Sequence, residues 1–191
     1  MNRNFLKNSL SALMVSLSLL TSSPHALAQT YKEVEWIELM PKDDLDALLN
    51  PPEYLNEITD GSEQDTLDAL GNIEATDKQA KRYQSALESK AVIESFDGEN
   101  IRLPGFVVPL ENNEEQKIIE FFIVPYFGAC LHMPPPPPNQ MIFVRSAEGI
   151  ELESLYDAFW FEGTVHIKTM KNEVGTAAYT LELANMTLYE E

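Results

Sequence analysis

Cysteine is almost absent from this sequence: Cys130 is the single cysteine among 191 residues. A chain with one cysteine cannot form an internal disulfide, so a disulfide-stapled fold is excluded. Four roles remain open for this thiol. It is a buried and inert apolar side chain, an intermolecular bridge, a metal ligand or a nucleophile.

Basic residues are also scarce. The chain has 13 Lys and Arg against 31 Asp and Glu, which gives a formal net charge of −18. Such a surface repels nucleic acid and anionic lipid, so we expect no nucleic-acid partner. The acidic excess suits divalent cations or a basic partner, and it also serves solubility alone.

Long hydrophobic runs are missing apart from one near the start, Leu10–Leu20. This run has 11 residues, whereas a membrane-spanning helix needs about 20. Arg3 and Lys7 precede it, and the small-x-small sequence Ala26-Leu27-Ala28 follows it. This order is typical of a secretory signal peptide, so we predict that residues 1–28 are cleaved off.

Cleavage after Ala28 makes Gln29 the first residue of the mature chain. The loss of two positive charges changes the formal net charge from −18 to −20. No other run is long enough to cross a bilayer. We therefore expect a periplasmic protein that is not embedded in a membrane.

Residues 29–90 are predicted to form an acidic, partly helical arm. Asp43 and Asp44 fall in the first turn of a predicted helix, where the helix dipole favours acids. Leucines follow at helical spacing until Pro51 stops the pattern. A second, thinly apolar helix is predicted over residues 77–89.

Residues 91–191 are rich in strand patterns. The expected strands cover residues 91–96, 100–110, 118–124, 140–145, 160–169 and 177–189, with a hairpin turn at Asp97-Gly98 and a helical turn over residues 152–157. Five or six strands in about 100 residues favour a mainly β fold. The specific prediction is a small antiparallel OB-like barrel with the arm at its N-terminal side.

An irregular segment interrupts the strands between residues 125 and 139. Five consecutive prolines end it, which predicts a stiff polyproline helix about 15 Å long at ~3.1 Å per residue. Prolines donate no backbone hydrogen bonds, so this segment can serve as a docking surface. The candidate partner-binding residues are Tyr126, Pro134, Pro135, Pro136, Pro137 and Pro138.

Two potential metal ligands lie just before the prolines. Cys130 and His132 are two residues apart, so on an extended segment both side chains face the same way. A thiolate and an imidazole suit zinc or copper, and His166, Met133 or Met141 could complete the site. The alternative stays open that Cys130 is a small buried side chain and His132 bonds a loop carbonyl.

Three stretches carry a resemblance to known proteins. They are Trp36-x-x-Leu39-Met40-Pro41-x-Asp43-Asp44-Leu45, Pro104-Gly105-Phe106-Val107-Val108-Pro109-Leu110, and Phe127-Gly128-Ala129-Cys130-x-His132-x followed by five prolines and Asn139-Gln140. The chain resembles an uncharacterised family of secreted bacterial proteins, classed as a domain of unknown function. The resemblance implies an OB-like barrel and a link to ABC-transporter systems for zinc supply, but no catalytic residues.

Three functions of different class follow from these observations. The first is a periplasmic accessory protein that binds zinc or copper and serves an ABC-transporter metal supply. The second is a non-enzymatic adaptor that docks an envelope partner through its proline-rich loop. The third is a thiol-dependent enzyme, for which the sequence supplies a base but no residue to orient it.

Overall fold

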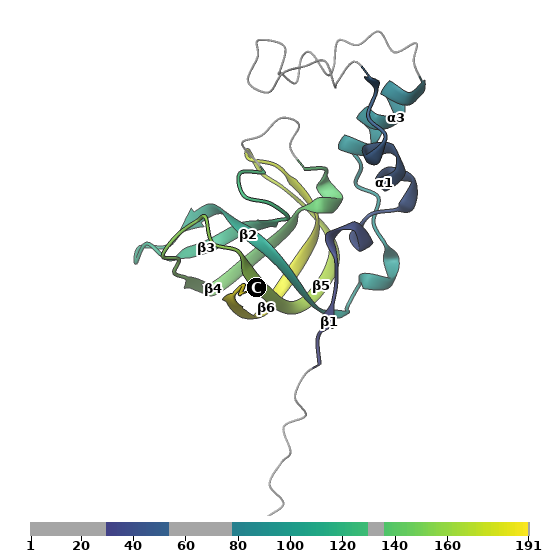
Figure 1. Cartoon of the computed structure of the whole chain (residues 1–191). Coiled ribbons are helices and arrows are strands. Elements are labelled where there is room, and N and C mark those ends of the chain that lie inside the picture. The colour runs from purple at the N-terminus through teal and green to yellow at the C-terminus, as the bar shows by residue number, and fades with distance from the viewer. Residues whose placement is uncertain (1–29, 54–77, 130–135, 191) are drawn as a thin grey trace, which may run out of the picture.

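The computed structural model describes residues 30–53, 78–129 and 136–190. Its elements are β1 (Lys32–Glu33), the 3₁₀ helix η1 (Trp36–Leu39), α1 (Lys42–Leu49), α3 (Lys78–Leu87), η3 (Glu94–Phe96), β2 (Asn100–Asn112), β3 (Ile118–Val124), η4 (Pro138–Gln140), β4 (Ile142–Ile150), β5 (Phe159–Lys171) and β6 (Thr176–Leu188). The strands form a barrel, and the two α-helices lie together on one side of it (Figure 1). No helix within the described residues is long and apolar enough to cross a membrane.

Five strands close the barrel. Their order is β2-β3-β4-β6-β5, and β5 pairs back with β2. Within the barrel all neighbours are antiparallel except β4 and β6, which pair in parallel. The short β1 also pairs in parallel, with the first residues of β2. This arrangement confirms the predicted mainly β, OB-like barrel with a helical arm.

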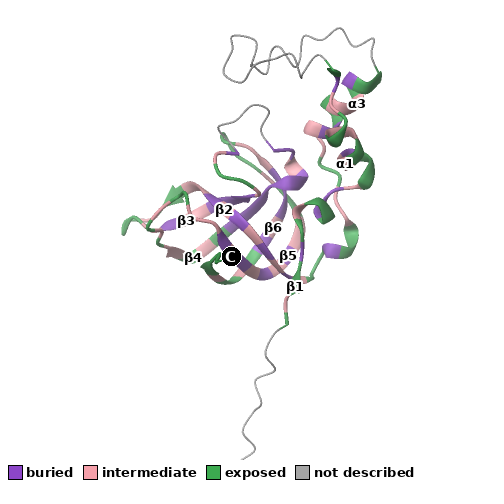
Figure 2. Cartoon of the chain, in the orientation of Figure 1, coloured by how far each residue is buried: buried purple, intermediate pink, exposed green. Residues whose placement is uncertain are grey.

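The barrel interior holds the main core. Alternate residues of β2 and β5 point inward, as the period of two along a strand requires. Figure 2 shows the buried residues along the strands, with exposed residues toward the hairpin tips and on the arm. The fully buried core residues include Ile101, Leu103, Phe121, Ile123, Ile142, Val144, Phe161, Val165 and Tyr179.

The arm belongs to this core rather than lying beside it. Val34 and Leu39 are 1% and 0% exposed and belong to the same cluster as the barrel residues. The Tyr179 hydroxyl donates a 2.8 Å hydrogen bond to the Leu39 carbonyl and accepts one of 2.8 Å from the Ile93 backbone N–H. Residues 34–39 therefore cover one side of the barrel and are held there by Tyr179.

A second set of bonds joins the arm to the end of the proline segment. Asp44 is 5% exposed and accepts a 2.7 Å bond from Arg82 on α3. Asn139, which is fully buried, donates to Asp44 at 3.3 Å and to the Ala91 carbonyl at 3.0 Å. Gln140 donates to the Trp36 carbonyl at 2.7 Å. These amides satisfy backbone and carboxylate acceptors that burial would otherwise leave unpaired.

A close approach explains the glycine in the middle of β2. A Cβ on Gly105 would lie 2.6 Å from a methyl group of Ile123 and 3.0 Å from the Val124 carbonyl oxygen. The Trp36 indole lies over the same position and donates a 2.7 Å hydrogen bond to the Pro104 carbonyl. Only glycine lets the arm tryptophan and β3 both contact β2 here.

Three local predictions are wrong: the strand over residues 91–96, the hairpin at Asp97-Gly98 and the helical turn over residues 152–157. Residues 91–96 form no strand, because the Ile93 N–H bonds the Tyr179 hydroxyl instead of a neighbouring strand and η3 follows. The turn at Asp97-Gly98 is present, but Gly98 bonds Val165 of β5 rather than closing a hairpin. Residues 152–157 form bends and turns rather than a helical turn.

Candidate functional site

The predicted metal ligands are only partly visible. Cys130, His132 and Met133 lie outside the described residues, as do Pro134 and Pro135. Within the residues that the structure describes, no group of three or more His, Cys, Asp or Glu is arranged to hold a metal ion. Zinc or copper binding therefore stays a prediction from the sequence.

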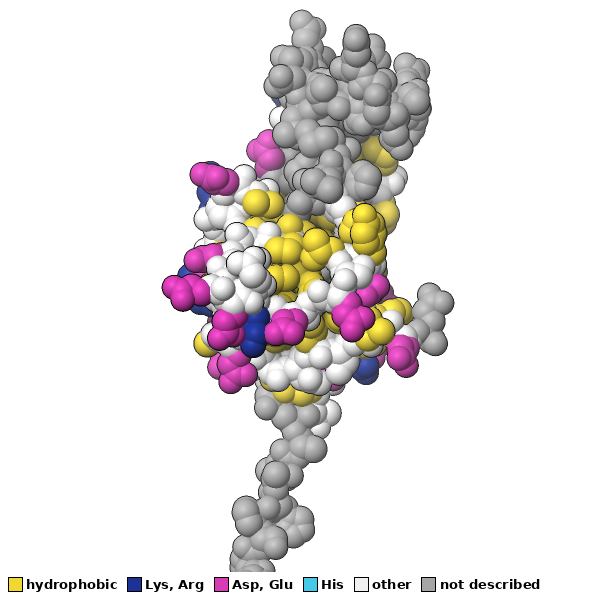
Figure 3. Space-filling model, turned by 90° about the vertical axis from the view of Figure 1, so that its left-hand side faces the viewer, with side chains coloured by type: hydrophobic (Ala, Val, Ile, Leu, Met, Phe, Trp, Pro, Cys, Tyr) yellow, Lys and Arg dark blue, Asp and Glu magenta, His cyan; other side chains and the backbone are white. Residues whose placement is uncertain are grey.

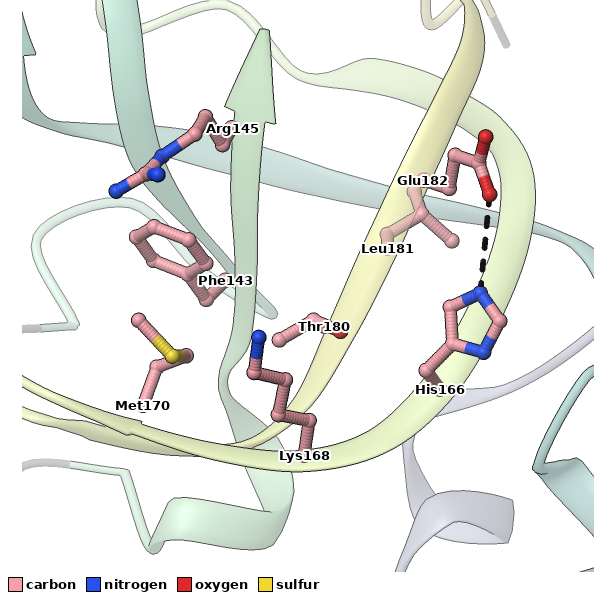
Figure 4. Close-up of a pocket in the computed structure, with 8 residues that line it drawn as sticks. All are labelled: Phe143, Arg145, His166, Lys168, Met170, Thr180, Leu181 and Glu182. Carbon is pink, nitrogen blue, oxygen red and sulfur yellow. Dashed lines mark ion pairs between the residues drawn. The ribbon is translucent and has the colours of Figure 1, made fainter.

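His166 lies on the outer surface of β5, in a shallow hollow of about 270 Å³ (Figure 4). Its Nε2 is 3.8 Å from Glu182, and its Nδ1 is 3.8 Å from Asp97. Arg145, on the opposite side of the hollow, donates a 2.7 Å bond from Nε to Glu120. Arg145 is thus paired with Glu120, and His166 lies between two carboxylates.

The last prolines lie against the protein rather than standing free. Pro136 and Pro137 are buried, and Pro138 is half-buried. Pro137 has polyproline backbone angles, with φ −62° and ψ 155°, but Pro138 already begins η4. Met141, which follows directly, is 2% exposed and packs near Gly175 in the β5–β6 turn.

An apolar groove opens at the start of this segment. Its volume is about 300 Å³, and it lies over the outer face of β2 and β3. Three loops complete it: the segment after β3, the β4–β5 connection and the β5–β6 turn. The lining residues are Phe106, Val107, Val108, Pro109, Val124, Phe127, Gly128, Leu155, Tyr156 and Val174.

Large apolar side chains stand exposed around this groove. Tyr156 is 74% exposed, Val174 51%, Leu155 43% and Phe127 42%. The Phe127 and Tyr156 rings lie 4.4 Å apart, and Phe127 meets Phe106 edge-on at 6.2 Å. Figure 3 shows a wide area of hydrophobic side chains on the face of the molecule away from the arm. A contiguous exposed apolar patch of this kind is a candidate interaction site.

The strand sequence explains why the patch exists. β2 carries apolar residues on both faces from Phe106 to Leu110, so its outer side chains need cover as well as its inner ones. The outer side chains Phe106, Val108 and Leu110 pack on a second cluster that includes Phe122 and Val124 of β3. The groove is the part of this outer cluster that the loops leave open.

A glycine positions Phe127, whose ring forms part of the groove wall. Gly128 has a φ of 74°, a left-handed conformation that favours glycine, and it lets the chain turn directly after Phe127. Tyr126, the predicted partner-binding residue, precedes Phe127 and is 44% exposed. The groove lining was not among the predicted partner-binding residues, and partner binding by Tyr126 and the prolines stays a prediction. The unbroken apolar run from residue 106 to residue 110 was the available signal.

The chemistry of the lining is uniform. Tyr156 supplies the one polar side-chain group among the lining residues. A groove lined almost entirely by apolar side chains suits binding of an apolar group. The β5–β6 turn that borders it is the loop between the last two barrel strands, one of the loops with which OB-folds bind ligands.

Comparison with known proteins places the chain in a family. The family described as "Protein of unknown function (DUF3299)" matches residues 36–188. The crystal structure of a DUF3299 family protein from Pseudomonas aeruginosa is similar, with 32% sequence identity and a TM-score of 0.61 over 85% of this chain and 99% of that chain. No curated protein matches the chain. The chain therefore belongs to the DUF3299 family of proteins of unknown function.

Proposed function

We propose that this protein is an exported, non-enzymatic adaptor of the bacterial envelope, which docks an apolar segment of a partner protein in the groove over β2 and β3. The observation that carries the proposal is the groove itself. Four large side chains that could have been buried, Phe127, Leu155, Tyr156 and Val174, stand exposed around one hollow. Exposed apolar side chains gathered at one place are the usual core of a protein–protein contact.

The composition of the groove favours a protein segment over a small polar ligand. Small-molecule sites combine apolar walls with a few placed polar groups that fix the orientation of the ligand. Here the lining offers a single side-chain hydroxyl, on Tyr156. Stacked aromatics such as Phe127 and Tyr156 are instead the residue types that carry most of the binding energy in protein interfaces.

The described end of the proline segment is held against the protein. Pro136 and Pro137 are buried, and Asn139 and Gln140 fix the end of the segment to the arm. Phe127 lies at the other end of the same segment. Ring contacts with Phe106 and Tyr156 hold Phe127 in place, so it loses little conformational entropy on docking, which favours binding.

A photo-crosslinking amino acid placed at Tyr156 tests the proposal in cells. The matched control position is Ile37, which is 51% exposed on the arm and is not part of the groove lining. We expect a discrete protein adduct from position 156 and none from position 37. The purified partner should then bind the wild-type protein and lose at least about tenfold in affinity with Phe127→Ala. Equal adducts from both positions, or unchanged affinity, would overturn the proposal.

The second candidate function is accessory metal binding for an ABC-transporter system. Its support is the Cys130-x-His132 sequence and the family resemblance described above. His166, the first candidate for a further ligand, is flanked by Asp97 and Glu182. This candidate is compatible with docking, since a metal-supply accessory protein also needs a partner.

A further inference from the structure

We infer that the segment docking in the apolar groove carries Lys or Arg residues beside its apolar side chains. This inference rests on the proposed docking function and adds the charge of the partner to it. The groove lining is neutral, so the evidence comes from the residues next to it along the chain.

Two of the three loops that form the groove carry carboxylates, and so does the end of β2. Glu111 follows the β2 part of the lining, Glu153 and Asp157 flank Leu155-Tyr156, and Glu173 directly precedes Val174. Glu111, Glu153 and Glu173 are exposed, and Asp157 is half-buried. Figure 3 shows Asp and Glu side chains bordering the hydrophobic area on this face, with few Lys or Arg among them. We call these four residues the acidic rim.

The acidic rim is not neutralised from within the protein. None of its four carboxylates takes part in an ion pair within the described part of the chain. Lys117 pairs with Glu115 and Glu151, and Arg145 pairs with Glu120, so neither of these cations neutralises the rim.

Unpaired negative charges around an apolar patch favour a partner segment that carries positive charges. A segment with acidic residues would add repulsion to every rim carboxylate, whereas Lys or Arg beside the apolar side chains would gain attraction at each. The net charge of −18 extends the same preference to the approach of the partner, because long-range steering favours a basic segment. The effect must weaken as salt rises, since exposed charges are screened beyond about 8–10 Å at physiological ionic strength.

Three synthetic peptides test this inference on the mature protein. They share one apolar core, Leu-Phe-Ile-Leu-Phe, and carry two Lys, two Gln or two Glu on each side of it. Fluorescence anisotropy would measure their affinities at low and at 0.3 M salt. We expect the Lys-flanked peptide to bind at least about tenfold more tightly than the Glu-flanked peptide at low salt, and the ratio to shrink at high salt.

Two quadruple variants separate the rim from the overall charge. The rim variant is Glu111→Gln, Glu153→Gln, Asp157→Asn and Glu173→Gln. The matched control is Asp43→Asn, Glu53→Gln, Glu94→Gln and Glu99→Gln, four exposed carboxylates of the arm side that make no ion pair in the described structure. Both variants change the net charge equally. The Lys preference should fall several-fold in the rim variant alone.

The outcomes distinguish the inference from the function on which it rests. Equal affinities of all three peptides, each weakened by Tyr156→Ala, would overturn the inference that the docking segment is basic. The groove would remain a docking site. A Lys preference that falls equally in both variants would mean that overall charge acts rather than the rim, which also overturns the inference. Binding that Tyr156→Ala does not weaken would remove the docking function itself.

Discussion

Replacement of Tyr179 by Phe isolates the contact that holds the arm on the barrel. The substitution keeps the buried ring and removes the hydroxyl that donates to the Leu39 carbonyl and accepts from the Ile93 N–H, both at 2.8 Å. The Leu39 carbonyl lies in a fully buried residue, so its lost partner costs about 1–3 kcal/mol. The Ile93 N–H is only half-buried, and its lost bond costs about 0.5–1.5 kcal/mol.

Tyr179→Phe should therefore lower the free energy of unfolding by roughly 2–4 kcal/mol. Urea unfolding followed by tryptophan fluorescence measures this directly, and the dependence on urea concentration should keep its slope because the exposed area hardly changes. Tyr156→Phe is the matched control. Tyr156 is 74% exposed, so the control should change stability by less than about 0.5 kcal/mol.

The burial of Tyr179 also predicts that the free energy of unfolding depends on pH. Burial is the main cause that raises the pKa of Tyr179 above its ordinary value of 10.0. A group whose pKa is raised in the folded state contributes stability that is complete below its unfolded pKa and is lost as pH rises through the folded pKa. The wild type should thus lose more stability than Tyr179→Phe above pH 10. A stability loss under 0.5 kcal/mol at neutral pH, or equal alkaline losses, would refute the assigned role of the hydroxyl.

Three further predictions concern the mature chain, the arm and the metal. Intact-mass measurement of periplasmic protein should give a chain that begins at Gln29, and a retained leader would contradict the export prediction. Residues 91–191 expressed alone should lack a cooperative melt, because Leu39 is a fully buried part of the core; a two-state transition would show that the barrel is independent. Calorimetric titration of Zn(II) and Cu(I) into reduced, chelator-treated protein should show micromolar or tighter binding that is lost in Cys130→Ser and in His132→Ala, and that weakens as pH falls because the thiolate protonates. Equal weak binding by all three proteins would assign the ions to the acidic surface.

The barrel strands were predictable because their pattern is local. Alternating apolar residues mark β5 and β6 within a few residues of their observed ends, and the same holds for β3. The segment over residues 91–96 has a similar apolar content but no strand, because the hydroxyl of Tyr179, far along the chain, takes its backbone donor. Tertiary hydrogen bonds of this kind leave no local trace in a sequence.

The groove could not be predicted from the sequence, for a related reason. Its lining comes from β2, β3 and three separate loops, so only the closed barrel brings Phe106, Phe127, Tyr156 and Val174 together. The sequence showed the need for cover over the apolar run of β2, but not which loops cover it. The metal prediction stays untested, since Cys130 and His132 lie outside the described residues.

The three stretches that carry the family resemblance have two structural roles. Trp36, Asp44 and the pair Asn139-Gln140 join the arm to the end of the proline segment through buried hydrogen bonds. Phe106 and Phe127 form the wall of the groove, and Phe127 begins the segment that Asn139-Gln140 ends. The arm thus anchors one end of the loop that carries the groove wall. These exposed apolar side chains are the feature on which the proposed docking function rests.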